Sequence, residues 1–307
     1  MRARAWGLAA ALGLLSAWGT AAAVMGNEPE SPRSGFILGD GGTSSRDARE
    51  AARKALPLDR LTESDRREVE RVLRNPTLYR RLPIESFVCD RELLDFCLAK
   101  PEVVVDIWRV LGISRLSLDR TAANQWRMSD GWGTEGTLRL LHHDSSPEGG
   151  TMVLHGKGGY KGPLSPQALS GSCLVVVRHR PTGIGPDGSA RHSMQVDAFL
   201  DADGMGLEVV TRTLQPLICR SSASNLHEIC LFMETLSDAA AENPEGVALL
   251  GAKLSKVDPR DGRTFAALAR DVGHDGVPAD PIATKKLPAK LAARWLPSRD
   301  LQAERVR

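Results

Sequence analysis

Five histidines lie in or beside the strands predicted for the middle of the chain. They are His142, His143, His155, His179 and His192. Because alternate residues of a strand point to the same face of a sheet, several of these imidazoles could converge there. Converging imidazoles bind metal ions or act as general bases near neutral pH. Their spacing matches no metal-binding or catalytic motif, so we name no metal ligand and no catalytic residue, and we expect no cofactor.

A glycine-rich segment, 156–163, follows the third of these histidines and has the composition of a loop at the rim of a sheet. Glycine lets a backbone approach a ligand closely, and Tyr160 adds an aromatic face. The segment is either a flexible hairpin loop or a loop that closes over a ligand. Ligand cavities are mostly apolar and carry a few polar groups. The candidate ligand-binding residues are Arg139, His155, Tyr160 and His179.

Known catalytic motifs are incomplete in this sequence. His227 and Glu228 begin a zinc-protease motif, but Leu231 stands where the second histidine ligand would be. The glycines in 183–188 have the spacing of a nucleotide-binding loop, but a strand is predicted after them where that motif needs a helix. A G-x-S-x-G nucleophile motif is absent. These observations favour a protein that is not an enzyme.

The first 23 residues have the pattern of an export signal. A basic start, Met1–Arg4, precedes the apolar run Ala5–Trp18 and a small-residue cleavage motif that ends near Ala23. We therefore expect cleavage near Ala23 and a mature protein in the periplasm or outside the cell. The apolar run is shorter than the roughly 20 residues that cross a membrane. We expect no transmembrane segment in the mature chain.

The mature chain carries no net formal charge. The full sequence has 40 Lys and Arg against 38 Asp and Glu, and two of the positive residues, Arg2 and Arg4, belong to the export signal. A domain without a basic surplus lacks the electrostatic footprint of a nucleic-acid-binding protein. We therefore expect no nucleic-acid partner.

Five cysteines remain after signal cleavage, and an odd number leaves at least one thiol outside a disulfide. Cys219 and Cys230 are the best candidates for a bridge, because a serine-rich turn is predicted between them. The absence of C-x-x-C argues against a redox pair and against a cysteine-based zinc site.

Composition divides the chain into a linker, one domain and a tail. Residues 24–60 have the composition of a flexible linker, and residues 271–307 that of a disordered basic tail. A single α+β domain is expected over 61–270. Within this domain the patterns predict a charged helix, two further helices, a sheet and C-terminal helices, over 61–83, 84–112, 121–214 and 225–270.

Apolar residues alternate with a period of two through the predicted sheet. This pattern predicts six strands over 122–129, 134–142, 150–157, 172–180, 192–200 and 206–214. Short turn-forming segments separate the strands, so the sheet should be antiparallel, and Asp203-Gly204 should close its last hairpin. Asn225 can then cap a long amphipathic helix, with Glu228 completing the capping box.

The predicted order of helices, six antiparallel strands and a long amphipathic helix resembles the helix-grip arrangement of START-like domains, which bind lipids and other hydrophobic ligands. The resemblance covers about residues 84–256 and implies a curved sheet around the C-terminal helix, with a cavity between them. Such domains usually have a strand before the first helices, and none is predicted here. The segment Pro101–Trp108 is similar to exported proteins of planctomycete bacteria that have no known activity.

Three functions are consistent with these patterns. The leading hypothesis is an exported, non-catalytic module that binds an apolar small molecule or lipid between sheet and helix. The first alternative is a hydrolase or metal-dependent enzyme that uses the strand histidines. The second is an envelope-associated structural or interaction protein whose basic tail, 283–307, contacts anionic surfaces.

Overall fold

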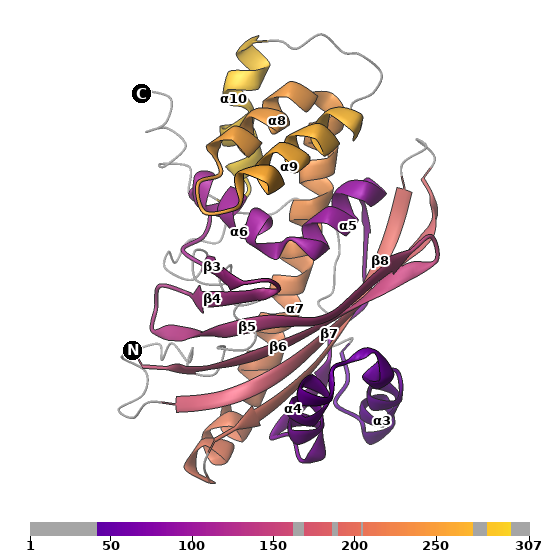
Figure 1. Cartoon of the computed structure of the whole chain (residues 1–307), viewed down its shortest axis with the longest axis vertical. Coiled ribbons are helices and arrows are strands. Elements are labelled where there is room, and N and C mark those ends of the chain that lie inside the picture. Colours follow the sequence, from indigo (N-terminus) through magenta and orange to yellow (C-terminus); the bar gives the residue numbers. More distant parts are fainter. Residues whose placement is uncertain (1–41, 162–168, 186–189, 204, 273–280, 296–307) are drawn as a thin grey trace.

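The structure is a computed structural model that describes residues 42–161, 169–185, 190–203, 205–272 and 281–295 (Figure 1). The expected export signal over 1–23 lies outside the described residues, as do the first part of the expected linker and the end of the expected tail. The chain folds as an α+β protein in which helices cover both faces of one antiparallel sheet.

Eight strands form the sheet in the spatial order β1-β8-β7-β6-β5-β4-β3, and β2 also pairs with β8. Every pairing is antiparallel. The strands are β1 (Leu78–Arg81), β2 (Glu85–Val88), β3 (Ser117–Ala122), β4 (Gln125–Ser129), β5 (Thr134–Ser146), β6 (Gly149–Tyr160), β7 (Leu169–Ile184) and β8 (Ala190–Ala202). Five of the six predicted strands fall on β4 to β8, in their predicted order.

The prediction of a last strand over 206–214 is wrong, because this segment is helical. Strand β8 ends at Ala202 and helix α7 (Met205–Glu242) follows, so the chain enters a helix where Asp203-Gly204 was expected to turn a hairpin. Asn225 therefore lies inside α7 and does not begin it. Strands β1 and β2 come before the helices α5 (Arg91–Ala99) and α6 (Pro101–Val110). They lie within 61–83 and 84–112, which were predicted to be helical, so that part of the prediction is wrong.

Several of the remaining helices begin at recognisable signals. Their bounds are α3 (Arg46–Lys54), α4 (Glu63–Arg74), α5 (Arg91–Ala99), α6 (Pro101–Val110), α8 (Pro244–Lys253), α9 (Pro259–Val272) and α10 (Pro281–Ala292), with a 3₁₀ turn at Leu58–Arg60. The side chains of Ser45, Thr62 and Asp90 each accept a hydrogen bond from a backbone N–H of the first turn that follows. Pro101 and Pro244 occupy first-turn positions, where no backbone N–H is needed.

The sheet separates two apolar layers. Helices α3 and α4 lie in front of the strands in Figure 1, and α7 crosses behind them. The smaller layer joins α3 and α4 to Val153, Leu174, Val176 and Phe199 of the sheet. The larger layer joins the opposite side of the same strands to α5, α6 and α7 and to the C-terminal helices. The candidate ligand-binding residues on the sheet therefore face either the layer against α3 and α4 or the layer against α7.

Parts of the expected linker and tail belong to the packed structure. Within 24–60, helix α3 buries Ala52 against α4 and the sheet. Within 271–307, helix α10 buries Leu287 and Leu291 in the larger layer, and Trp295 contacts Phe232 of α7 edge-on at 5.5 Å between ring centroids. Both segments are rich in charged residues. Their composition therefore predicted a linker and a disordered tail, although a few apolar residues in each face the core.

Candidate functional site

The two faces of the sheet differ in how completely they are packed. On β7, Leu174 and Val176 face α3 and α4 and have no accessible surface, whereas their neighbour Val175 on the α7 face keeps 7%. The same contrast recurs on β8, where Phe199 is 0% exposed and Ala198 is 8% exposed. Interior side chains normally pack at crystal-like density. At these positions of β7 and β8, the side chains toward α7 therefore keep a small accessible surface that the side chains toward α3 and α4 do not.

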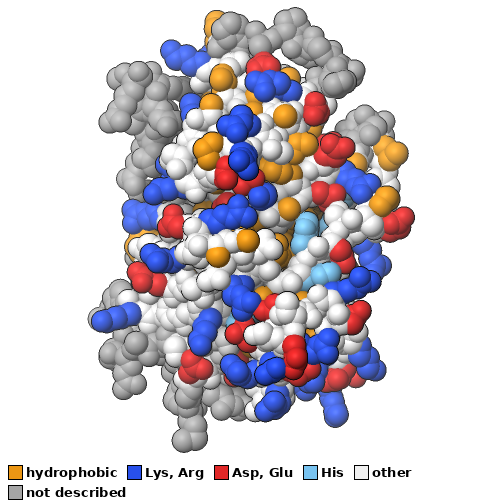
Figure 2. All heavy atoms as spheres, viewed as in Figure 1, with side chains coloured by type: hydrophobic (Ala, Val, Ile, Leu, Met, Phe, Trp, Pro, Cys, Tyr) orange, Lys and Arg blue, Asp and Glu red, His pale blue; other side chains and the backbone are white. Residues whose placement is uncertain are grey.

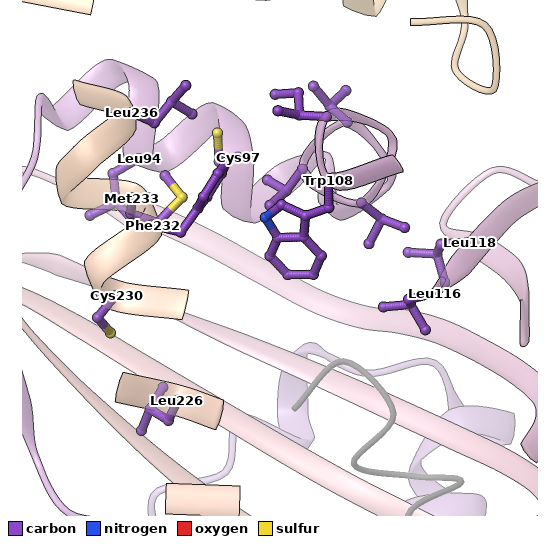
Figure 3. Packing of buried hydrophobic residues seen from close by; sticks show 14 of the residues in the cluster. Leu94, Cys97, Trp108, Leu116, Leu118, Leu226, Cys230, Phe232, Met233 and Leu236 are labelled. Carbon is purple, nitrogen blue, oxygen red and sulfur yellow. The ribbon is translucent and has the colours of Figure 1, made fainter. Parts of the chain in front are cut away.

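Helix α7 supplies an apolar surface to this layer. Leu226, Cys230, Met233 and Leu236 follow one another along the helix and are buried (Figure 3). Between Cys230 and Met233 along α7, Phe232 meets Trp108 of α6 in an edge-to-face contact at 5.8 Å between ring centroids. Aromatic packing therefore joins α6 to α7 at this level.

A polar cluster lies on the same face of the sheet, beneath α5. It contains His143 of β5, His179 of β7, His192 of β8 and Asp95 of α5, and the charge of Asp95 acts on all three imidazoles. The Nε2 atom of His179 lies 3.9 Å from Oδ1 of Asp95. Figure 2 shows histidine side chains reaching the surface between α5 and the sheet. We call these four residues the histidine cluster.

Backbone geometry brings the histidine cluster together. Gly150 of β6 lies opposite His179 in the sheet, and a Cβ atom at Gly150 would stand 2.5 Å from the His179 Nε2 atom. A register shift between Leu140 and His142 turns His143, in place of His142, toward the α5 face. A glycine and a β-bulge together therefore set the spacing of these imidazoles.

Each member of the histidine cluster has a buried polar atom without a hydrogen-bond partner among the described residues. These atoms are Oδ1 of Asp95, Nε2 of His143, Nε2 of His179 and Nδ1 of His192. Buried polar groups are normally satisfied, so each exception needs an explanation. Four such atoms in one place make this cluster the strongest candidate for contact with a ligand.

Burial lowers the pKa of all three imidazoles of the cluster. The nearby carboxylate of Asp95 opposes this shift, but desolvation of the charged imidazolium is the larger effect. The histidines are therefore neutral at pH 7. The His192 Nε2 atom lies 3.1 Å from the carbonyl oxygen of Cys89. A carbonyl oxygen only accepts, so Nε2 carries the proton and Nδ1 of His192 is an acceptor.

Arg139 and His155, two of the predicted ligand-binding residues, lie side by side but on the other face of the sheet. They are paired across β5 and β6, and Arg139 forms ion pairs with Asp65 and Glu68 of α4. The Nδ1 atom of His155 lies 3.5 Å from the Glu68 carboxylate. These contacts attach α4 to the sheet, and they separate Arg139 and His155 from the layer against α7.

A second polar network on that face surrounds Asp197 of β8. Its carboxylate, which has no accessible surface, accepts hydrogen bonds from Tyr79 at 2.7 Å, from Arg81 at 2.9 Å and from Arg178 at 2.6 Å. Burial, the largest effect, and the Asp197 carboxylate both raise the pKa of the Tyr79 hydroxyl. A buried carboxylate with this many donors is fully compensated, so the network joins β1, β7 and β8 structurally.

Of the other two predicted ligand-binding residues, only His179 belongs to the histidine cluster. Tyr160 is buried at the far end of β6, opposite Thr134 of β5. The predicted loop over 156–163 is wrong for 156–160, because these residues belong to strand β6 and pair with both β5 and β7. From 162 on, the glycine-rich segment lies outside the described residues. Sequence reasoning missed Asp95, which looked like one polar position in an apolar helix. It also missed Gly150, whose role depends on the register of two strands.

The expected disulfide between Cys219 and Cys230 is not formed. Both residues lie on α7, and eleven residues of helix separate their Cα atoms by about 16 Å. A disulfide spans less than about 7 Å between Cα atoms. All five cysteines are reduced and buried.

The described residues show neither a membrane-spanning helix nor a metal-binding group of side chains. None of the helices there combines the length and apolar character needed to cross a bilayer. In the same part of the chain, no three His, Cys, Asp or Glu side chains are placed as they stand to hold a metal ion. A comparison of the sequence with models of protein families gives no match, and a comparison with curated proteins gives none either.

Proposed function

We propose that this protein is an exported, non-catalytic module of the START-like, helix-grip type that binds an apolar small molecule or lipid between the sheet and α7. The observation that carries the proposal is the alternation of exposure along β7. Val175 and Val177 keep 7% of their surface on the α7 face, while Leu174 and Val176 keep none on the other.

Water is bound poorly in an apolar layer. The Leu, Val, Met and Cys side chains between the sheet and α7 offer water few hydrogen-bond partners. An apolar ligand would replace that poorly bonded water and would gain about 25 cal/mol for each Å² of apolar surface removed from solvent. The module needs no catalytic residue for this role.

The test uses two neighbouring valines that face opposite sides of the sheet. Val175→Phe directs a ring into the layer against α7, where the proposal places the ligand, and Val176→Phe directs the same ring into the layer against α3 and α4. We expect Val175→Phe to change the thermal midpoint little. We expect Val176→Phe to lower the free energy of unfolding by about 1–3 kcal/mol, the usual cost of overpacking a core.

Ligand binding is measured with N-phenyl-1-naphthylamine, an uncharged probe whose fluorescence rises in apolar surroundings. The wild-type protein should bind the probe, and Val175→Phe should weaken that binding at least about tenfold by filling its place. Val176→Phe, measured at a temperature where it is folded, should bind it as the wild type does. Equal destabilisation by both variants, together with unchanged probe binding in Val175→Phe, would overturn the proposal.

A further inference from the structure

The histidine cluster lies at one end of the apolar layer, on the same face of the same strands. Along β7, Val175, Val177 and His179 share this face, since alternate residues of a strand do. The distance from Val175 to His179 along the strand is about 13 Å at about 3.3 Å per residue. On β8, His192 stands at the same end, beyond Met194 and Val196. An elongated amphiphile could therefore place its chain along Val175 and Val177 and its head among the histidines.

Two atoms at this end are acceptors without a donor among the described residues. Oδ1 of Asp95 has no hydrogen-bond partner, while its Oδ2 lies 3.7 Å from Nε of Arg91. Nδ1 of His192 also has none, and its imidazole is only 2% exposed. His179, which is 3% exposed, presents its Nε2 atom beside Asp95. Oδ1 of Asp95 and Nδ1 of His192 can therefore each accept a hydrogen bond from a ligand.

The charges around the cluster are mostly negative. Asp95 acts on all three imidazoles, Asp90 acts on His192, and Asp144 acts on His143 and His179. The positive charge in the same surroundings comes from Arg91 of α5, since the imidazoles of the cluster are neutral at pH 7. This field favours a cation and disfavours an anion.

We propose that the ligand is an amphiphile with a positively charged amine head, seated among His143, His179, His192 and Asp95. This inference rests on the proposed function, because it concerns the head group of the same ligand. A primary ammonium has three donors and no acceptor, which matches two fixed acceptors and a neighbouring imidazole. A carboxylate head would face Asp95 and would leave the same acceptors unsatisfied.

The test compares three ligands with one chain length and different heads. Dodecylamine, 1-dodecanol and dodecanoate compete with N-phenyl-1-naphthylamine for the wild-type protein at about pH 7.5, each below its micelle concentration. We expect dodecylamine to bind about tenfold or more tightly than dodecanoate, because a charge-assisted hydrogen bond to Asp95 forms only with the amine. 1-Dodecanol should fall between the two.

Asp95→Asn tests the role of the carboxylate, and Glu92→Gln is its matched control. Both changes remove one negative charge from α5, but Glu92 is exposed. Asp95→Asn should bring the amine and carboxylate affinities close together, and Glu92→Gln should leave their ratio unchanged. An equal effect of both variants would mean that the preference for the amine comes from the overall negative charge of α5 and not from contact with Asp95. That result would overturn the proposal.

A variant-free measurement covers the case in which Asp95→Asn does not fold. Dodecyltrimethylammonium has the chain length and the charge of dodecylamine, but its head has no N–H donor. Dodecylamine should displace the probe at a lower concentration, because only its head donates hydrogen bonds to Asp95 and His192. Equal affinities of the two cations would contradict the proposal.

The outcomes separate this inference from the proposed function. If the naphthylamine probe binds and all three ligands displace it equally, the head-group inference is wrong and the apolar site stands. If the protein binds neither the probe nor any of the three ligands, both are wrong. Tighter binding of dodecanoate than of dodecylamine at about pH 7.5 also overturns the inference.

Discussion

Gly150 sets how closely the imidazole of His179 can approach strand β6. A Cβ atom there would stand 2.3 Å from the carbonyl oxygen of Asp144 and 2.5 Å from Nε2 of His179. One of these contacts belongs to the backbone of β5, which cannot move aside like the end of a flexible side chain. The position therefore couples the geometry of the sheet to the geometry of the histidine cluster.

We expect Gly150→Ala to displace His179 and to destabilise the protein by about 1–3 kcal/mol, as overpacking does. The preference for an amine head should fall with it. Gly112→Ala serves as the control, because a Cβ atom at Gly112 meets nothing within 4 Å and adds only the strain of its positive φ. Chemical denaturation and ligand competition measure the two effects. Wild-type stability and head-group preference in Gly150→Ala would show that the imidazole does not lie against β6.

The buried histidines also make stability depend on pH. Burial lowers the pKa of His143, His155, His179 and His192 in the folded protein. In the unfolded chain their pKa is about 6.5, so the unfolded chain binds more protons as the pH falls below that value. The contribution of these groups to stability is therefore complete above about pH 6.5 and is lost progressively below it.

Urea denaturation at about pH 7.5 and about pH 5.5 measures this loss, and we expect a lower midpoint at the acidic pH. His179→Gln should reduce the difference, because it removes one of the titrating groups. A midpoint that is equal or higher at the acidic pH would contradict the buried, neutral state of the histidines.

Which histidines converge could not be predicted from the sequence. Leu138 and Leu140 face the larger apolar layer, and simple alternation would send His142 to that side. The register shift between Leu140 and His142 sends His143 there instead, and a bulge leaves little trace in an apolar–polar pattern.

Arg139 and His155 were expected at the ligand site because of their residue types. Their partners Asp65 and Glu68 are on α4, a helix that sequence spacing does not relate to the sheet.

Helix α10 extends the packed domain beyond residue 270, where the sequence predicted the domain to end. The sequence over 271–307 is rich in Lys, Arg, Pro and Ala, and this composition predicted disorder. Leu291 nevertheless packs into the larger apolar layer, and Lys290 forms an ion pair with Glu242 of α7. A short helix with two or three core residues depends on its tertiary contacts, since its own propensity is too weak to hold it.

Two substitutions on α10 test whether it belongs to the core. Leu291→Ala should lower the free energy of unfolding by about 2–5 kcal/mol, because it empties a buried position. Ile282→Ala, on the same helix, should change it little, since Ile282 is 63% exposed. Thermal denaturation compares them. Equal, negligible effects would mean that α10 does not pack on the rest of the molecule.

The long strands were predictable as elements, and the short strands and the start of α7 were not. Strands β5 to β8 carry enough alternating residues for the period of two to stand out. Strand β1 has only four residues, and its half-buried Arg81 forms an ion pair with Asp197, a partner that the sequence does not reveal. Residues 206–214 contain Val209, Val210, Thr211 and Thr213, which favour strands locally. They nevertheless form the first turns of α7, a 38-residue helix that runs across the sheet.

At the scale of the whole molecule, one sheet serves two purposes. On the face toward α3 and α4, Val153, Leu174, Val176 and Phe199 have no accessible surface, and the Asp197 network links β1, β7 and β8. On the face toward α7, Val175, Val177 and Ala198 keep 7–8% of their surface, and polar atoms without partners among the described residues lie under α5. A rigid, well-packed face of this kind can hold the strands in place while the other face stays available to a ligand. The α+β class and the antiparallel order were predictable, but this difference between the faces depends on packing.

Native mass spectrometry of the wild-type protein and of Val175→Phe, each mixed with N-phenyl-1-naphthylamine, tests the apolar site most directly, because it counts bound molecules per chain. We expect one probe molecule per wild-type chain and none per Val175→Phe chain, with both proteins folded. The same number of probe molecules on the two proteins, whether none or several, would contradict a binding site between the sheet and α7.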